Sequence, residues 1–169
     1  MSPSAEAVAL SVERKFTSRV KGTAVYLSRA EGCVPQSFLN NIHHNKVLHD
    51  RVIFLTCVGD EKPTVHPMKR VKVKKLSDSF WLVTAYYGYQ EEPDIESALH
   101  ACSLSKLYIH VHETVFFVSL ERIKISKINL FHDVKAKAFV FLRKNTLSLS
   151  EYLKIPTSRL VEIGVQLEI

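Results

Sequence analysis

Two histidines at alternate positions, His110 and His112, have the spacing in this sequence that most resembles a metal site. The β-rich run 107–118 predicts a strand, which would place both imidazoles on one face of a sheet. A protein zinc site needs at least a third ligand, and Glu113 would face the opposite way. We therefore expect two partly exposed histidines on an outer face and no metal site.

A second group of histidines, His43, His44 and His49, lies in and just after a predicted helix that begins at Pro35. Side chains on one helix share a face when they are three or four residues apart. Here the separations are one, five and six residues, so the imidazoles do not converge. We expect them to cap the helix, to hydrogen-bond near Asn45 or to contact a neighbouring segment.

Motifs of enzymes and of phosphate-binding loops are missing from the sequence. It has no G-x-S-x-G and no C-x-x-C, and its 5 glycines are scattered. Its 3 cysteines, Cys33, Cys57 and Cys102, are odd in number and widely spaced, which is typical of a reducing compartment. We expect no enzymatic activity and no cofactor, while a nucleotide held in a crevice at the strand ends is an alternative.

A basic segment from Lys62 to Lys75 contains six basic residues and no acidic one, and it accounts for the net charge of +6. Its basic side chains at 70, 72 and 74 alternate with Val71 and Val73, the pattern of a strand with one solvated face. We expect first that this solvated face protects the edge of the sheet from pairing with further strands. The second expectation is that it attracts an anionic lipid surface. Nucleic acid is not expected, because no aromatic side chains interleave to stack on bases.

Elements that would position these residues alternate between strands and helices, which predicts an α/β fold. The expected architecture is a mixed, mostly parallel sheet flanked by helices, layered like a nucleotide-binding protein. The run Arg51–Val58 is almost continuously apolar and indicates a central strand buried on both faces. A hairpin is predicted from 71–74 to 80–86, and further strands at 23–28, 107–118 and 159–169. Helices are predicted at 11–16, from Pro35, from Pro93 with Glu91, Glu92 and Asp94 around its first turn, at 131–142 and at 149–153.

The chain of 169 residues is long enough for one domain with its own core. Hydrophobic residues make up 46% and charged residues 24%, which are ordinary globular values. A membrane span needs about 20 consecutive apolar residues, and no such run occurs. We therefore expect a soluble chain, with residues 1–21 as a lead-in and residues 22–169 as the folded domain.

Four segments of the sequence match the motifs of a known family in the same order. Residues 19–27 are similar to R-V-P-G-T-A-V-F-L, and residues 41–52 to N-L-K-H-N-K-V-L-H-E-R-V. Residues 87–95 resemble Y-G-F-M-E-x-P-D-V, and residues 156–169 resemble P-P-N-R-V-V-E-L-G-x-Q-V-E-I. With these motifs the chain resembles the cytoplasmic C-terminal domain of the Kup potassium transporter family, and the likeness runs from about residue 11 to the end of the chain.

The family-motif positions carry no role that the resemblance assigns, and catalytic, metal and ion-coordinating residues are expected to be absent. These positions are Asn41, His44, Asn45, Lys46, His49, Tyr87, Gly88, Glu92, Pro93, Asp94, Arg159, Glu162, Gly164 and Gln166. One departure is clear, because Ser119 and Leu120 stand where the family has a Gly-Arg pair.

The resemblance implies a domain that follows the membrane part of a transporter importing K⁺ together with H⁺. It implies a position on the cytoplasmic face of the inner membrane, with the membrane domain of the same transporter and a second copy of the chain as partners. The implied role is regulation or assembly, and an enzyme is the least favoured alternative.

Overall fold

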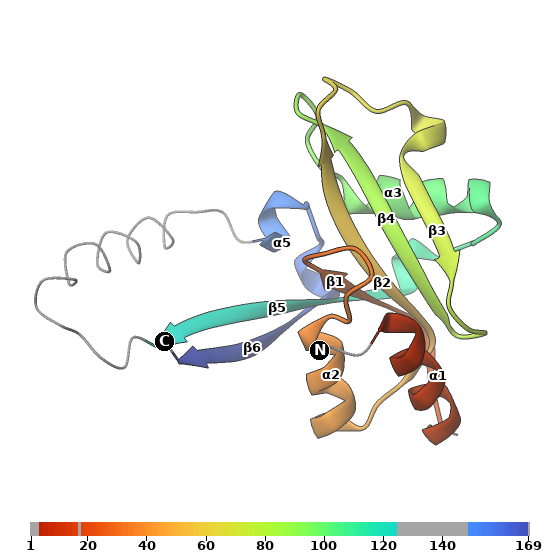
Figure 1. Cartoon of the computed structure of the whole chain (residues 1–169), viewed down its shortest axis with the longest axis vertical. Coiled ribbons are helices and arrows are strands. Elements are labelled where there is room, and N and C mark those ends of the chain that lie inside the picture. The colour runs from red at the N-terminus through yellow and green to blue at the C-terminus, as the bar shows by residue number, and fades with distance from the viewer. Residues whose placement is uncertain (1–3, 17, 125–148, 169) are drawn as a thin grey trace, which may run out of the picture.

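The computed structural model describes residues 4–16, 18–124 and 149–168. Their strands form one six-stranded sheet in the order β3-β4-β2-β1-β5-β6 (Figure 1). All neighbours are parallel except β3 and β4, which form the predicted antiparallel hairpin. The α/β class with a mixed, mostly parallel sheet is therefore confirmed. The strands are β1 (Val20–Ser28), β2 (His49–Asp60), β3 (Val71–Lys75), β4 (Phe80–Gly88), β5 (Thr114–Lys124) and β6 (Leu160–Glu168).

The helices in the described part of the chain are short apart from the first. They are α1 (Ala5–Lys15), α2 (Gln36–Asn40), α3 (Ile95–Ala101) and α5 (Leu149–Tyr152), with a π-helical turn at Asn41–Asn45 directly after α2. Single 3₁₀ turns occupy Pro67–Lys69, Cys102–Ser105, Val111–Glu113 and Thr157–Arg159.

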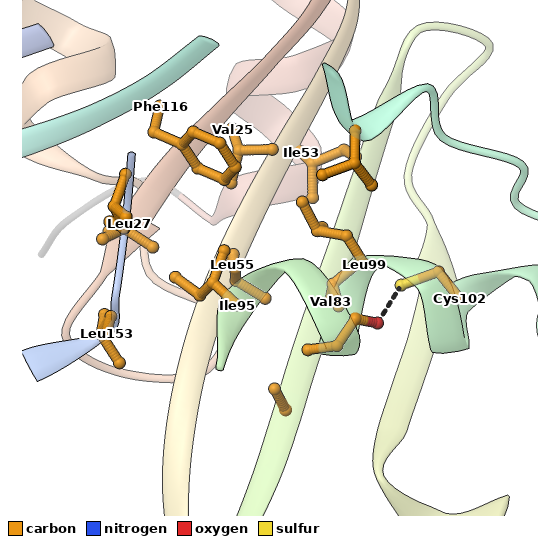
Figure 2. Close-up of a cluster of buried hydrophobic side chains, with 14 of the residues drawn as sticks. Val25, Leu27, Ile53, Leu55, Val83, Ile95, Leu99, Cys102, Phe116 and Leu153 are labelled. Carbon is orange, nitrogen blue, oxygen red and sulfur yellow. Dashed lines mark hydrogen bonds between the residues drawn. The ribbon is translucent and has the colours of Figure 1, made fainter. Parts of the chain in front are cut away.

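Strand β2 contributes side chains to both layers of the core, as its continuous apolar run predicts. Val52 and Phe54 point to the face covered by α1 and α2, whereas Ile53 and Leu55 point to the face covered by α3. Figure 2 shows the α3 face, where Leu99 of α3 packs against the strand residues. All four β2 side chains are fully buried, so the central-strand prediction is confirmed.

The opposite face is built around an aromatic cluster. Phe38 of α2 is fully buried and meets Tyr26, Phe54 and Phe80 at centroid distances of 5.1, 5.0 and 5.7 Å. All three contacts are edge-to-face, a geometry that adds about 0.5–1.5 kcal/mol per pair beyond area burial. This cluster attaches the short helix α2 to the sheet.

Helix α1 also belongs to this layer. Its Ala5, Val8, Ala9 and Val12 recur at helical spacing and are buried in the same cluster as Phe54. Most of the stretch expected as a lead-in is thus helical, and the helix begins well before residue 11.

The β5–β6 pair extends beyond the rest of the sheet. Strand β1 pairs only with Thr114–Phe117 of β5, whereas β6 pairs with β5 from Phe116 to Lys124. Figure 1 shows the two strands running together away from the other four. Beyond Phe117, the ladder therefore consists of two parallel strands.

Three local predictions are wrong. Residues 107–113 are not a strand, because β5 begins at Thr114 and residues 111–113 form a 3₁₀ turn. The helix predicted from Pro93 begins at Ile95, with Asp94 as its N-cap. The central strand, predicted over Arg51–Val58, is longer at both ends, since β2 spans His49–Asp60. The helix predicted at 131–142 lies outside the described residues.

Candidate functional site

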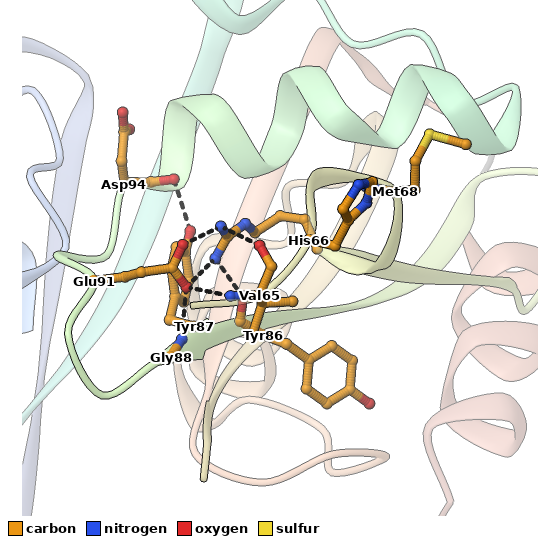
Figure 3. A network of polar contacts seen from close by, with 9 residues as sticks. Val65, His66, Met68, Tyr86, Tyr87, Gly88, Glu91 and Asp94 are labelled. Atoms are coloured by element: carbon orange, nitrogen blue, oxygen red, sulfur yellow. Dashed lines mark hydrogen bonds and ion pairs between the residues drawn. The ribbon is translucent and has the colours of Figure 1, made fainter. Parts of the chain in front are cut away.

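An ion pair between Arg70 and Glu91 organises the carboxyl ends of β2 and β4 (Figure 3). Arg70 lies between the 3₁₀ turn Pro67–Lys69 and β3, and Glu91 lies in the turn after β4. The contact is bidentate: Nη1 donates to Oε2 at 2.9 Å and Nη2 donates to Oε1. Both side chains are mostly buried, with exposed fractions of 17% and 19%.

The remaining hydrogen-bonding groups of the pair go to the backbone around it. Arg70 donates to the carbonyl oxygens of Tyr86 at 2.7 Å and Val65 at 3.0 Å. Oε2 of Glu91 accepts the N–H groups of Gly88 at 2.6 Å and Val65 at 3.0 Å. The pair therefore fastens three backbone segments to one another, and we call it the Arg70–Glu91 clamp.

The clamp shifts the ionisation of its members. The hydrogen bonds from Arg70, followed by the N–H of Gly88, lower the pKa of Glu91 to about 2. The hydrogen bond to Glu91 raises the pKa of Arg70 above its usual value. Glu91 is consequently a carboxylate throughout the physiological pH range.

Gly88 is required at its position by the closeness of another backbone. A Cβ atom on Gly88 would lie 2.2 Å from the carbonyl oxygen of Pro63. Tyr89 and Gln90 then donate their N–H groups to the carbonyls of Lys62 and Pro63 at 3.0 and 3.1 Å. The turn after β4 and the loop after β2 are thus in direct backbone contact.

Tyr87 and Asp94 connect the clamp to α3. The guanidinium of Arg70 lies 4.9 Å from the centroid of the Tyr87 ring, a cation–π contact. The hydroxyl of Tyr87 donates to the carbonyl of Asp94 at 2.7 Å, and burial raises the pKa of Tyr87. Oδ1 of Asp94 accepts the N–H of Glu96 at 3.0 Å and so caps the helix.

A cavity of about 720 Å³ opens beside the clamp, and we call it the strand-end cavity. Its lining residues come from the end of β2, the following loop and β4: Asp60, Lys62, Thr64, Val65, His66, Met68, Lys69 and Tyr86. In Figure 3 the side chains of Tyr86 and His66 point away from the hydrogen-bonded network. The carboxyl ends of parallel strands are where α/β sheets place their ligands.

The basic side chains of the segment from Lys62 to Lys75 do not all lie where the alternating pattern predicts. Lys72 and Lys75 pair with Glu31 at 3.6 Å and Asp78 at 2.9 Å, and Lys74 pairs with Glu6. These lysines lie on the edge strand β3, and their side chains are at least half exposed. The prediction that Arg70 shares this solvated face is wrong, because its side chain turns inward to the clamp.

His110 and His112 do not share a strand face, so the geometry expected of them is wrong. His110 precedes the 3₁₀ turn Val111–Glu113, which contains His112. His110 instead lines a smaller cavity of about 230 Å³ with His100 and Tyr108. Within residues 4–16, 18–124 and 149–168, no group of three His, Cys, Asp or Glu side chains could hold a metal ion.

The motif positions from Asn41 to Lys46 fold the end of α2 into its π turn. The Asn41 amide donates to the hydroxyl of Tyr26 at 2.9 Å and to the carbonyl of Val47 at 3.0 Å. The Asn45 amide donates to Oδ1 of Asn41 at 2.9 Å, and Lys46 ends the turn with a φ of 54°. These asparagines position the chain for β2.

The histidines of that segment separate, since His44 is exposed on the π turn while His49 is buried at the start of β2. The His49 ring lies 6.0 Å from that of Phe117, and its Nδ1 has no hydrogen-bond partner among the described residues. Burial lowers the pKa of His49, against the opposing effect of Asp50.

Motif positions after residue 91 also make structural contacts. Glu92 pairs with Lys154 at 2.7 Å, and Pro93 is buried. Arg159 pairs with Glu96 of α3, donates to the carbonyl of Val111 and lies 5.8 Å from the Phe116 ring centroid. Together these contacts attach α3 to the segment before β6.

The last motif positions lie on β6. The Glu162 carboxylate accepts from the hydroxyl of Ser150 at 3.4 Å. Gly164 and Gln166 pair with Leu120 and Arg122 in the ladder. At the departure from the family pattern, Ser119 Oγ accepts the N–H of Ser37 at 3.0 Å, which ties β5 to α2.

Sequence reasoning missed the clamp. Arg70 stood among solvated lysines and Glu91 among the residues expected around a helix start. Neither position in the sequence indicates that the two side chains meet. The sequence offered one weak signal: Glu91 is a carboxylate in the family-like segment 87–95, three residues after Gly88.

The fold and the strand-end cavity define an α/β domain with a cavity at the carboxyl ends of β2 and β4. The family model described as "K+ potassium transporter C-terminal domain" matches residues 21–169, and the chain belongs to that family. No solved structure matches the chain.

Curated relatives agree with this family. The chain is 44% identical over 165 residues to a "Probable potassium transport system protein Kup" of Vibrio cholerae. It is 42% identical over 166 residues to a "Low affinity potassium transport system protein Kup" of Klebsiella pneumoniae. Each alignment covers 98% of this chain and 27% of the relative, so the chain spans about a quarter of the relatives' length. Among the described residues, no helix combines the length and apolar character needed to cross a bilayer.

Proposed function

We propose that this domain regulates or assembles a Kup-type transporter that takes up K⁺ in symport with H⁺. The observation that carries the proposal is the family match over residues 21–169 together with relatives named for potassium transport. In this proposal the domain lies on the cytoplasmic face of the inner membrane and contacts the membrane domain of the same transporter. It does no chemistry of its own.

The physical basis of the proposal is a set of contacts that would transmit the effect of a bound partner from one element of the domain to another. The clamp, the Gly88–Pro63 approach and the Arg159–Glu96 pair connect the sheet to α3 through groups with fixed partners. A partner that binds one of these elements would change the position of the others, because packed polar networks do not deform continuously.

The transport role is tested with a chimera that joins this domain to the membrane part of the Vibrio cholerae relative. Rubidium uptake is measured in cells that lack other potassium uptake systems, with the amount of transporter in the membrane quantified in parallel. We expect removal of the domain to reduce either uptake per transporter or the amount assembled. Unchanged values of both would contradict the proposal.

We also propose that two copies of the domain pair through β6. This strand is an edge of the sheet within the described residues, and Val161 on it is 39% exposed. The other edge, β3, carries lysines that oppose strand addition, whereas an uncovered edge is a template for pairing. Sedimentation at high micromolar concentration is expected to show a dimer that V161K weakens. The control is L10K, which places the same charge on the exposed Leu10 of α1; a monomer at all concentrations would contradict the pairing.

A nucleotide-binding module is the alternative that the strand-end cavity favours. Calorimetric titration of the chain with ATP and with cyclic dinucleotides distinguishes a nucleotide-binding module from a domain with a purely structural role. Saturable heats at micromolar nucleotide would promote nucleotide sensing over a purely structural role.

A further inference from the structure

The described lining of the strand-end cavity carries a net positive charge. Lys62 and Lys69 line it, and neither ammonium group forms an ion pair there, in contrast to the three lysines of β3. Asp60 is the acidic lining residue, and its Oδ1 accepts the backbone N–H of Lys62 at 3.1 Å. With Asp60 counted, the lining retains an excess of one positive charge.

The walls of this cavity are fixed by the clamp. Val65 lines the cavity, and both of its backbone groups are held, the N–H by Glu91 and the carbonyl by Arg70. Tyr86 also lines it, with its carbonyl bound by Arg70 and its N–H donating to the Arg70 carbonyl at 2.8 Å. A site whose walls are fixed before a ligand arrives loses less conformational entropy on binding.

The cavity also offers a hydrogen-bond donor and an apolar surface. Nδ1 of His66 accepts the N–H of Met68 at 3.2 Å, so Nε2 is the ring nitrogen that carries a proton. That nitrogen is left as a donor, since His66 is exposed. The Tyr86 ring is half-buried, and Met68 is 69% exposed, an unusual state for a thioether side chain.

We propose that the strand-end cavity binds the phosphate group of a phosphorylated small molecule. Lys62 and Lys69 supply the charge that attracts the phosphate oxygens, and Nε2 of His66 donates a hydrogen bond to them. Tyr86 and Met68 contact the planar or apolar part of the ligand, and Asp60 accepts from a ligand hydroxyl. A volume of about 720 Å³ lies inside the usual range of about 300–1,000 Å³ for small-molecule sites.

This proposal does not depend on the transport role, because it rests on the cavity alone. It makes the nucleotide-binding alternative more specific, since it names the phosphate group as the part of the ligand that is recognised. The same phosphate chemistry is available from a soluble metabolite or from a lipid headgroup. The experiment therefore includes a probe for each source.

Binding is measured on the 169-residue chain by calorimetry and by ¹H–¹⁵N spectra. The probes are inorganic phosphate, ribose 5-phosphate and adenosine 5′-monophosphate, with adenosine as the phosphate-free comparison. Vesicles of phosphatidylcholine with and without phosphatidylglycerol test the lipid source. The variant is K62Q/K69Q, and the matched control is K15Q/K21Q, which removes the same charge from two exposed positions outside the cavity.

We expect the organic phosphates to bind and adenosine to bind far more weakly. K62Q/K69Q should weaken phosphate binding by about tenfold or more, while K15Q/K21Q changes it by less than about twofold. Spectral shifts should centre on residues 60–69 and Tyr86. The same dependence on Lys62 and Lys69 seen only with phosphatidylglycerol vesicles also supports phosphate recognition and assigns its source to lipid.

Three results would overturn the proposal. The first is the absence of saturable binding for every probe up to about 5 mM. The second is equal weakening by the two double variants, which would show a general charge effect. The third is binding of adenosine as tight as that of its monophosphate. Circular dichroism of K62Q/K69Q tests whether the variant is folded, and we expect it to be, because both lysines are exposed.

Discussion

The two ends of β2 hold titratable side chains in opposite ways. Beyond its carboxyl end, the Glu91 carboxylate accepts hydrogen bonds from Arg70, Gly88 and Val65. At its amino end, the His49 imidazole is buried against Phe117 with Nδ1 unpartnered among the described residues. The first group is stabilised in its charged form and the second in its neutral form.

The comparison shows that the strand-end site stabilises a charged side chain, whereas the layer formed by α1 and α2 stabilises a neutral one. A charged group can be kept among the clamp residues because each of its oxygens has a donor. Among the described residues, Asp50 is the carboxylate that would favour a proton on His49, and burial outweighs its effect on the pKa. Four substitutions, from the largest expected effect to the smallest, would break or sharpen this comparison.

G88A should have the largest effect. The added Cβ would overlap the Pro63 carbonyl, so the turn after β4 and the loop after β2 must separate. We expect a loss of about 3 kcal/mol or more in the free energy of unfolding, measured by urea denaturation. The control is G59A, since nothing lies within 4 Å of a Cβ there; equal effects of the two variants would contradict the close approach.

E91Q should have the next largest effect, because its amide would present a donor to groups that already donate. A carboxylate whose folded pKa is lowered stabilises the fold above its ordinary pKa of 4.5, and this stability is lost as pH falls towards about 2. Acid titration of the melting temperature should therefore be flatter in E91Q over that window. E92Q is the matched control, because Glu92 is 81% exposed and should leave the profile nearly unchanged.

H49Q tests the other end of β2. A histidine whose folded pKa is lowered is protonated more readily in the unfolded chain, so stability falls as pH drops below the ordinary value of 6.5. We expect H49Q to remove most of the pH dependence just below 6.5 while leaving that of Glu91 at lower pH. The exposed His100 supplies the control H100Q, and a profile in H49Q identical to that of the unchanged chain would contradict the burial argument.

K74S should have the smallest effect. Lys74 pairs with Glu6, but the two side chains are 59% and 52% exposed. Exposed ion pairs contribute about 0–1 kcal/mol, so we expect a loss of about 0.5 kcal/mol or less. A double-mutant cycle with E6Q measures the coupling energy of the pair directly. A coupling energy of about 2 kcal/mol would contradict the expected difference between this exposed ion pair and the mostly buried Arg70–Glu91 pair.

Much of the sheet could be predicted because its local patterns agree with its burial. The apolar run of β2 and the alternation of Val71 and Val73 in β3 both have the burial that their patterns indicate. Asp94 is the N-cap beside the predicted helix start. In contrast, the run 107–113 is β-rich but turns as 3₁₀ before Thr114, where the chain crosses from α3 to the sheet.

The site could not be predicted in the same way, because its contacts join residues far apart in sequence. Arg70 and Glu91 are separated by a complete hairpin, and Arg159 reaches Glu96 across most of the second half of the chain. The need for glycine at 88 comes from the Pro63 backbone rather than from its own turn. Periodicity reports the face of an element, but it carries no information on which distant polar groups meet there.

The order of strands also sets an order of folding events. Strands β1, β2, β3 and β4 are contributed by one continuous half of the chain, whereas β5 reaches β1 by joining Thr114 to Thr23. Closing so long a loop is slow, so the four-stranded half should form before β5 and β6 attach. The amides of β2 should then be the last to exchange with deuterium, and those of β5 beyond Phe117 among the first.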